Sequence, residues 1–139
     1  MKPFRFYIES GLVRQGSKDP GEAKAMLARA SKRLEYVKSQ SINEDNVSFL
    51  FEDIYETMRE CVHGLMAANG YKPYSHEATV AFLEEYYKSY FGERLVGAFN
   101  RYRIIRNNIM YRANSVSKED AVKALEIAEI FVRKTAELV

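Results

Sequence analysis

Apolar residues recur at intervals of three and four positions along most of the chain, the spacing that places side chains on one face of a helix. Five such segments follow residue 18, and each has helix-start or helix-stop residues at its ends. No segment sustains an alternation of apolar and polar residues with period two, which a strand-rich fold requires. The pattern predicts an all-α fold, an antiparallel up-and-down bundle of four main helices plus a shorter helix.

Short polar residues and glycines set the expected limits of these helices. Four residues are predicted to cap helix starts: Asp19, Ser41, Ser75 and Ser117. Ser41 with Glu44 forms a capping-box pattern, which places the start of the second helix there. The predicted helices run over residues 20–39, from Ser41 to Asn69, over 76–90, over 93–112, and from about 118 to the last residues.

The first 18 residues lack this pattern. Their four apolar residues between positions 4 and 8 fit either a short helix packed on the bundle or a loose terminus. We therefore expect an N-terminal arm over residues 1–18 and a single helical domain over residues 19–139.

Composition limits the function in a few respects. A length of 139 residues with 47% hydrophobic and 29% charged residues is typical of one globular domain. A net charge of +2 is too small for a protein that coats nucleic acid, so any anion must meet a local positive cluster. Cys61 is the single cysteine, which excludes an intrachain disulfide, and we expect it to be buried. Arg5 and Glu9 interrupt the N-terminal apolar stretch, so we expect no signal peptide, no membrane partner and a cytoplasmic location.

Conventional catalytic motifs are absent, and no metal or cofactor is predicted. The helical period places His63 on the polar face of its segment, with Glu56 and Glu60, where we expect it to be solvated. His76 has no second His or Cys at ligand spacing. Five tyrosines gather around the third predicted helix, where they fit a core edge or subunit interface better than base stacking: Tyr71, Tyr74, Tyr86, Tyr87 and Tyr90.

The fourth predicted helix concentrates positive charge, because it carries five arginines and no acidic residue between positions 94 and 112. Four of them are candidates for binding an anion or RNA: Arg101, Arg103, Arg106 and Arg112. Arg106 falls about 20° from Leu95 around the helix, on the same stripe as Phe99, Tyr102 and Ile109. The other three arginines lie on the flanks, where solvated charge accounts for them.

Arg106 requires a partner, because a guanidinium stays charged and is costly to bury alone. It can form a buried ion pair with Glu52, Asp53 or Glu56 of the second helix, or it can line a cleft that admits an anion. The sequence leaves both interpretations open.

Two stretches carry a resemblance to a known family. The run RYRIIRNNIMY, followed by a capped last helix, and the run YKPYSHEATVAFL, which leads into the third helix, resemble the HEPN domain family of prokaryotes, the second run its archaeal members. The resemblance covers roughly residues 19–138. It implies an antiparallel helical bundle that usually forms homodimers. It also implies one of two roles, since many members are metal-independent endoribonucleases and many are toxin-like partners of minimal nucleotidyltransferases.

The family motif is Arg, four to six residues, then His, often with Asn directly after the Arg. Arg106 and Asn107 match its first two positions, and Tyr111 stands where the histidine belongs. The resemblance therefore implies a degenerate catalytic set of Arg106, Asn107 and Tyr111. A tyrosine with a pKa of about 10 can donate a hydrogen bond at neutral pH but is a poor base. In some members the partner modifies a tyrosine near the motif.

Helical geometry adds a prediction about assembly. Positions 106 and 111 lie about 140° apart around the helix and roughly 7.5 Å apart along it, so they cannot line one narrow face. A twofold dimer that brings two such helices together would supply the missing walls. The predicted dimer interface is a strip of small, polar or aromatic residues: Gly97, Asn100, Ile104, Asn107 and Tyr111.

Two functional hypotheses follow. In the first, the protein is the non-catalytic or weakly active dimeric partner of a minimal nucleotidyltransferase, in a toxin–antitoxin-like or nucleotide-binding module. In the second, it is a metal-independent endoribonuclease or RNA-binding toxin in which Arg106 holds a phosphate. We expect the first.

Overall fold

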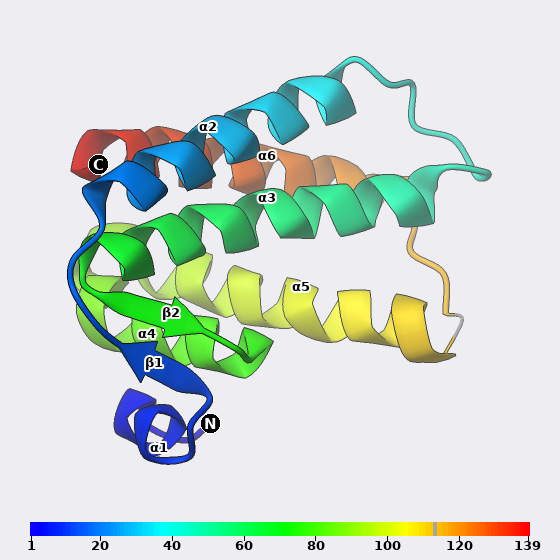
Figure 1. The fold of residues 1–139 in the computed structure, drawn as a ribbon. Coiled ribbons are helices and arrows are strands. Elements are labelled where there is room, and N and C mark those ends of the chain that lie inside the picture. Colours follow the sequence, from blue (N-terminus) through cyan, green and yellow to red (C-terminus); the bar gives the residue numbers. More distant parts are fainter. Residues whose placement is uncertain (113) are drawn as a thin grey trace.

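The computed structural model describes residues 1–112 and 114–139, and most of them are helical (Figure 1). In chain order the elements are α1 (Phe4–Glu9), β1 (Val13–Gln15), α2 (Pro20–Lys38), α3 (Val47–Ala68), β2 (Tyr71–Pro73), α4 (His76–Phe91), α5 (Glu93–Arg112) and α6 (Lys118–Leu138). The long helices α2, α3, α5 and α6 have 19 to 22 residues, and α4 has 16. The predicted all-α class, with four main helices and a shorter one, is confirmed.

Three of the predicted helix caps are present. The side chains of Asp19, Ser75 and Ser117 each accept a hydrogen bond from the backbone N–H three residues further on, at 2.9, 3.4 and 3.1 Å. Gly92 separates α4 from α5 with φ of 88°, a left-handed conformation that glycine adopts without strain. Local chemistry therefore defines most helix boundaries.

The predicted start of the second helix at Ser41 is wrong. Helix α3 begins at Val47, and the preceding residues form polar turns. The Asn43 side chain accepts the backbone N–H of Asn46 at 3.0 Å, and the Asn46 side chain accepts the backbone N–H of Asn43 at 2.8 Å. These side-chain bonds offer the backbone an alternative to the helix that Ser41 would have capped.

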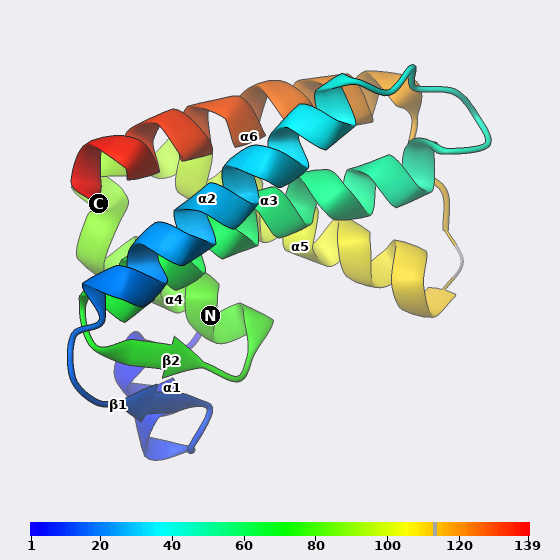
Figure 2. The same cartoon turned by 45° about the horizontal axis from the view of Figure 1, so that its top comes forward.

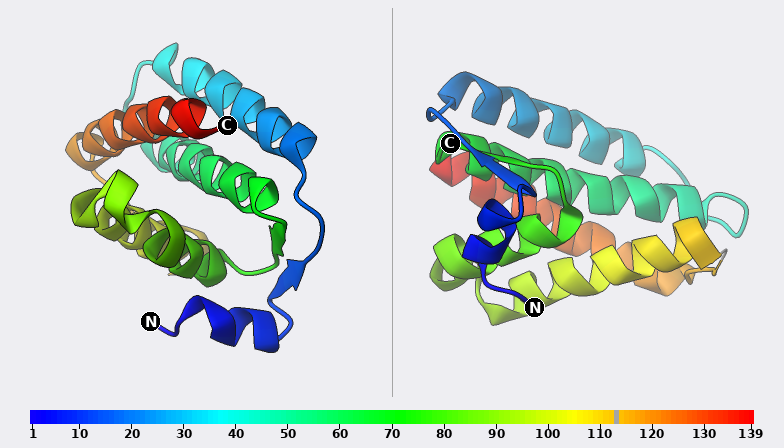
Figure 3. Two further views of the ribbon diagram at one scale, coloured as in Figure 1. Left: turned by 90° about the vertical axis from the view of Figure 1, so that its left-hand side faces the viewer. Right: turned by 60° about the horizontal axis from the view of Figure 1, so that its bottom comes forward.

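Helix α3 lies at the centre of the bundle and packs against α2, α4, α5 and α6 (Figures 1 and 2). In the end-on view of Figure 3, α2 lies on one side of α3 and the α4–α5 pair on the other. The side chains of Ile54, Tyr55, Met58 and Cys61 have no exposed surface. Cys61 is buried as predicted, and burial raises the pKa of its thiol to about 12.

The predicted polar face of α3 is also covered, because α2 packs over it, so solvated positions for His63 and Glu60 are wrong. Glu60 is 1% exposed, and its carboxylate pairs with Arg29 at 2.6 Å and Arg33 at 2.9 Å. The His63 side chain is 16% exposed, and within the described residues its ring nitrogens have no hydrogen-bond partner. Its Nε2 lies 3.5 Å from a Glu22 carboxylate oxygen.

The N-terminal arm packs against the bundle. Strand β1 pairs with β2 in antiparallel fashion, with Val13 opposite Pro73, and α1 contacts α4. Phe4 is 1% exposed, and its ring meets those of Phe82 and Tyr71 edge-on, with centroids 5.4 and 5.1 Å apart. Of the two alternatives for this segment, the short packed helix is therefore observed. The division into an arm and a domain of residues 19–139 remains a prediction.

The tyrosines near α4 mostly occupy the edge of the core, as predicted. The hydroxyl groups of Tyr71 and Tyr86 lie 2.9 Å apart, and the Tyr87 hydroxyl accepts a hydrogen bond from Asn69 at 2.8 Å. Tyr74 and Tyr86 differ, because they are 57% and 43% exposed. Within the described part of the chain, no helix combines the length and the apolarity needed to span a bilayer.

Candidate functional site

Helix α5 carries the motif residues, and its two halves have different surroundings. Its five buried residues, Leu95, Val96, Ala98, Phe99 and Tyr102, all precede position 103. From Arg103 to Arg112 every side chain is half-buried or exposed. The motif therefore lies on the less buried half of α5, where Ile105 and Ile109 still pack against the core.

Arg106 is half-buried, as its place on the apolar stripe predicted, but it forms no ion pair with any described residue. Its Nη1 donates a hydrogen bond to the Asn107 side chain at 3.2 Å. Asp53 and Glu56, two of the three expected partners, pair with arginines of α2 and α3 instead. Of the two interpretations left open, the buried ion pair is therefore not formed.

Tyr111 is 75% exposed, and its neighbours Ile104 and Met110 are each 46% exposed. The strip predicted to form a dimer interface, from Gly97 to Tyr111, is half-buried or exposed along its whole length. A Cβ atom added at Gly97 would have no heavy atom within 4 Å. This face of α5 is open to another molecule.

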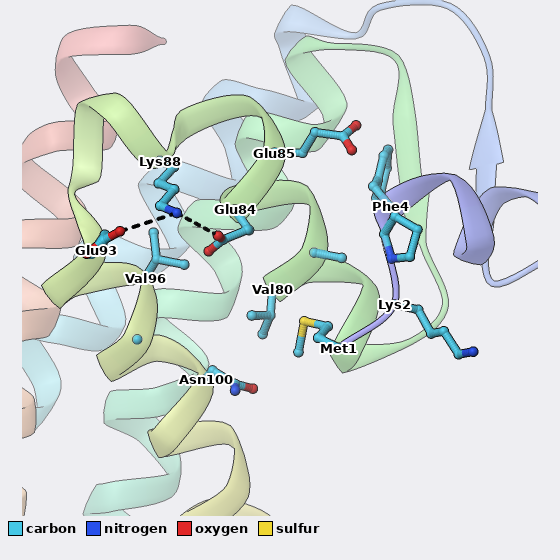
Figure 4. A pocket seen from close by; sticks show the side chains of 13 residues that line it. Met1, Lys2, Phe4, Val80, Glu84, Glu85, Lys88, Glu93, Val96 and Asn100 are labelled. Carbon is cyan, nitrogen blue, oxygen red and sulfur yellow. Dashed lines mark ion pairs between the residues drawn. The ribbon is translucent and has the colours of Figure 1, made fainter.

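The strip continues into a groove of about 680 Å³ between the first residues of the chain, α4 and α5 (Figure 4). Val80 and Val96 contribute apolar surface to the groove, and Gly97 and Asn100 belong to both the strip and the groove. On one side, Lys88 bridges Glu84 and Glu93 at 3.1 and 3.4 Å. The groove thus extends the open surface of α5 towards α4.

A second group of polar residues gathers where α4 begins. His76 is the first residue of α4, directly after the capping residue Ser75. Its Nδ1 lies 2.9 Å from the Tyr55 hydroxyl, and the two rings are nearly parallel with centroids 5.7 Å apart. On its other side the Tyr55 ring stacks on Phe99 of α5, also at 5.7 Å. A continuous stack therefore joins α4, α3 and α5.

Positive charge surrounds this histidine. Burial lowers the pKa of His76, and the nearby guanidinium groups of Arg106, Arg59 and Arg103 lower it further, while Glu56 acts in the opposite direction. Arg103 donates to the Asn100 side chain and lies 3.7 Å from the carboxylate of Glu77 in the first turn of α4. His76 is therefore neutral at pH 7 among three arginines from α3 and α5.

The four arginines predicted to bind an anion fall into two groups in the structure. Arg103 and Arg106 lie near His76, whereas Arg101 and Arg112 are exposed elsewhere on α5. The Arg101 guanidinium lies 5.3 Å from the centre of the Tyr102 ring. Arg101 and Arg103 are two positions apart, so they point about 160° away from each other around the helix.

No spacing or motif along the chain indicates that His76 lies near Arg106. The position of His76 depends on helix α3, because its Nδ1 contacts the hydroxyl of Tyr55, a residue 21 positions earlier in the chain. A polar residue directly after a helix cap was the available signal, and it is a common one. Within residues 1–112 and 114–139, no three His, Cys, Asp or Glu side chains come together as a metal site.

The fold and the motif helix define a small all-α domain with an Arg-Asn motif on its penultimate helix. A family model described as "HEPN domain" matches residues 23–138, and the chain belongs to the HEPN domain family. The predicted resemblance is confirmed. No curated protein matches the sequence.

Proposed function

We propose that the protein is the non-catalytic or weakly active dimeric partner of a minimal nucleotidyltransferase, in a cytoplasmic toxin–antitoxin-like or nucleotide-binding module. The observation that carries this proposal is the position of Tyr111. It occupies the place of the motif histidine, and its side chain is 75% exposed on an open face of α5.

The chemistry of RNA cleavage explains why this position matters. Without a metal, cleavage requires a base that takes a proton from the ribose 2′-hydroxyl and a cation that stabilises the negative charge on phosphorus. Arg106 is suited to the second task. A tyrosine hydroxyl with a pKa of about 10 is poorly suited to the first, so the motif provides a cation without an efficient base.

The open strip on α5 supports the dimer. Its small residues Gly97 and Asn100 allow a second helix to approach closely, and Ile104 provides apolar surface that is 46% exposed. A twofold axis along this strip would place two copies of Arg106 and Tyr111 near one another.

The second candidate is a metal-independent endoribonuclease, and one observation favours it. Arg106 has no carboxylate partner among the described residues, so its charge is available to a phosphodiester. In this case the catalytic contribution of Arg106 would exceed that of Tyr111.

Incubation with structured RNA in the presence of a chelator separates the two candidates. We expect no cleavage by the wild type or by Arg106→Ala, and cleavage by Tyr111→His, which restores the imidazole. Arg94→Ala, at an exposed position of α5 outside the four candidates, serves as the control for loss of a positive charge. Cleavage by the wild type that Arg106→Ala abolishes and Arg94→Ala retains would refute the non-catalytic role.

The partnership has its own test. Co-expression with a minimal nucleotidyltransferase encoded beside this gene should give a stable complex, and light scattering should show a dimer of the chain at micromolar concentration. Ile104→Glu should make the chain monomeric without unfolding it. The absence of such a neighbouring gene, or a monomeric wild type, would remove the basis of the proposal.

A further inference from the structure

Two cations lie directly opposite each other in the short sheet. The register of β1 and β2 pairs Arg14 with Lys72, and both residues are exposed. Within residues 1–112 and 114–139, neither of them forms an ion pair with a carboxylate. Like charges directly opposite on two strands destabilise a sheet, so the stability of this sheet does not account for the pair.

Both cations border a cavity of about 200 Å³ between the sheet, the start of α2 and the end of α3. The linker from β1 to α2 forms one side of it (Figure 1). Two backbone hydrogen bonds fasten this linker to the end of α3, from Gly16 N–H to the Gly70 carbonyl at 2.8 Å and from Asp19 N–H to the Ala67 carbonyl at 2.9 Å. Gly70 has φ of 86°, and a Cβ atom there would lie 2.6 Å from the Gly16 carbonyl oxygen, so this close approach requires a glycine.

The start of α2 supplies the opposite charge, because Asp19 and Glu22 line the same cavity. Among the described residues, neither carboxylate pairs with a cation of the sheet. The Nε2 atom of His63 lies 3.5 Å from Glu22. Burial first, and Arg59 second, lower the pKa of His63, although Glu22 acts in the opposite direction, so this histidine is neutral at pH 7. It therefore does not balance the charge of Glu22.

Two cations and two carboxylates thus border one small cavity without pairing across it. We propose that the cavity binds a free α-amino acid with a small side chain, whose carboxylate contacts Arg14 and Lys72 and whose ammonium group contacts Asp19 and Glu22. A zwitterion satisfies both pairs of charges at once. The end of α3 adds to the attraction for the ammonium group, because the carboxyl end of a helix carries partial negative charge.

The size of the cavity agrees with this class of ligand. One water molecule occupies about 30 Å³ in the liquid, so the cavity holds roughly seven waters, the space that an amino acid such as alanine or serine fills.

The charges disfavour two other classes of ligand. A nucleic acid strand carries one negative charge per roughly 3.4 Å, and Asp19 and Glu22 would repel it. A simple anion would satisfy the two cations only. This site goes beyond the proposed function, which uses α5, and none of the residues that line the cavity lies on that helix.

Titration of the ¹⁵N-labelled full chain with L-alanine at low ionic strength, followed by amide NMR shifts, tests the proposal. We expect saturable shifts at Ser17, Gly70 and Lys72. Propionate lacks the ammonium group and ethylamine lacks the carboxylate, so each should bind about fivefold more weakly or less tightly still. Propionate that binds as tightly as L-alanine would reduce the cavity to a simple anion site, and the dipeptide Ala-Ala binding as tightly would assign it to peptides. Either result, or the absence of saturable shifts with millimolar L-alanine, would overturn the proposal.

Two variants and a matched control locate the binding. Lys72→Ala and Glu22→Gln should each weaken L-alanine binding about fivefold or more, because each removes one charged partner. Lys24→Ala removes an exposed lysine of α2 outside the cavity and should change binding less than about twofold. An equal loss in Lys24→Ala and Lys72→Ala would show that diffuse positive charge attracts the ligand and would refute the site.

Thermal denaturation separates loss of binding from loss of folding. Lys72→Ala removes one of two like charges that face each other, so its melting temperature should equal or exceed that of the wild type. If Glu22→Gln does not fold, Lys72→Ala decides, and unchanged L-alanine binding in that variant would refute the proposal. Both variants should keep the oligomeric state and the nucleotidyltransferase binding of the wild type, so failure of this site and failure of the proposed function are distinguishable.

Discussion

Two glycines inside long helices have opposite surroundings, and alanine substitution should distinguish them. A Cβ atom at Gly64 of α3 would lie 3.1 Å from the Ala23 carbonyl oxygen and 3.4 Å from the Met26 Cβ atom of α2. A Cβ atom at Gly97 of α5 would have no heavy atom within 4 Å. The glycine at position 64 therefore allows close approach of α2, whereas the one at position 97 faces open space.

These contacts set the sign of each substitution. Replacing glycine by alanine inside a helix favours the folded state by about 1 kcal/mol. Gly97→Ala should retain this gain and raise the melting temperature by about 3–5 °C. Gly64→Ala should not show this gain in stability, because the added methyl group would press on the backbone carbonyl of Ala23 and such overpacking costs about 1–3 kcal/mol. We expect its free energy of unfolding to fall by about 0–2 kcal/mol.

Urea denaturation at low protein concentration measures both effects without a contribution from assembly. Equal stabilisation by the two substitutions would refute the close approach of α2 and α3 at Gly64. Gly97→Ala carries a second readout at high concentration. If two α5 helices meet at this strip, the added methyl group should weaken the dimer while stabilising the monomer, which sedimentation measures.

Three further substitutions test the packing of the bundle. Glu60→Gln should lower the free energy of unfolding by about 1.5–3 kcal/mol, because the guanidinium of Arg33 loses a buried charged acceptor; urea denaturation measures this. Burial first, and a nearby guanidinium second, lower the pKa of His63 in the folded state. The unfolded chain therefore binds a proton at this histidine more readily than the folded chain does. The free energy of unfolding should fall as the pH falls below about 6.5, by at most about 1.4 kcal/mol per pH unit. His63→Leu should reduce this slope. Phe4→Ala should release the arm from Phe82 and accelerate proteolysis within residues 1–18, while the rest of the bundle stays folded.

Glu60→Gln and Phe4→Ala each have a matched control variant. Glu44→Gln removes a carboxylate that is exposed before α3, and it should change stability by less than about 0.5 kcal/mol. A pH slope that is unchanged in His63→Leu would show that other groups cause it. Loss of the whole fold in Phe4→Ala would contradict the predicted division at residue 18, and Phe6→Ala, at a 40% exposed ring, is its comparison.

Local signals in the sequence were sufficient for most of the fold. Asp19, Ser75 and Ser117 cap helices where predicted, because capping depends on residues three positions apart. The predicted helix start at Ser41 is wrong for an equally local reason. The side chains of Asn43 and Asn46 accept hydrogen bonds from each other's backbone N–H, and these bonds hold the segment in turns instead of a helix. Competing short-range hydrogen bonds of this kind cannot be ranked from spacing alone.

The errors at His63 and Glu60 have a different cause. A stripe of apolar residues identifies one buried face, but α3 contacts other helices on several sides, so polar positions are buried as well. Two arginines of α2 make the burial of Glu60 possible, and no periodicity within α3 could reveal them.

Only part of the candidate site has a signal in the sequence. The position of Arg106 on the apolar stripe of α5 singles it out, and its role at a site stays a prediction. His76 has no such signal, because its proximity to Arg106 arises from three helices that meet in space. Residues on different helices that come close in space have no characteristic spacing along the sequence.

The pairing of β1 with β2 has a consequence for the order of folding. Val13 and Pro73 lie about sixty positions apart, so closing this loop in an unfolded chain has a large entropic cost. Formation of the α2–α3 hairpin brings the two strands together and removes most of that cost. The strand pair should therefore form last during folding and open first in the native state. Hydrogen exchange should then be faster at the amides of β1 than in α3, and each opening would briefly uncover the aromatic rings beneath α1.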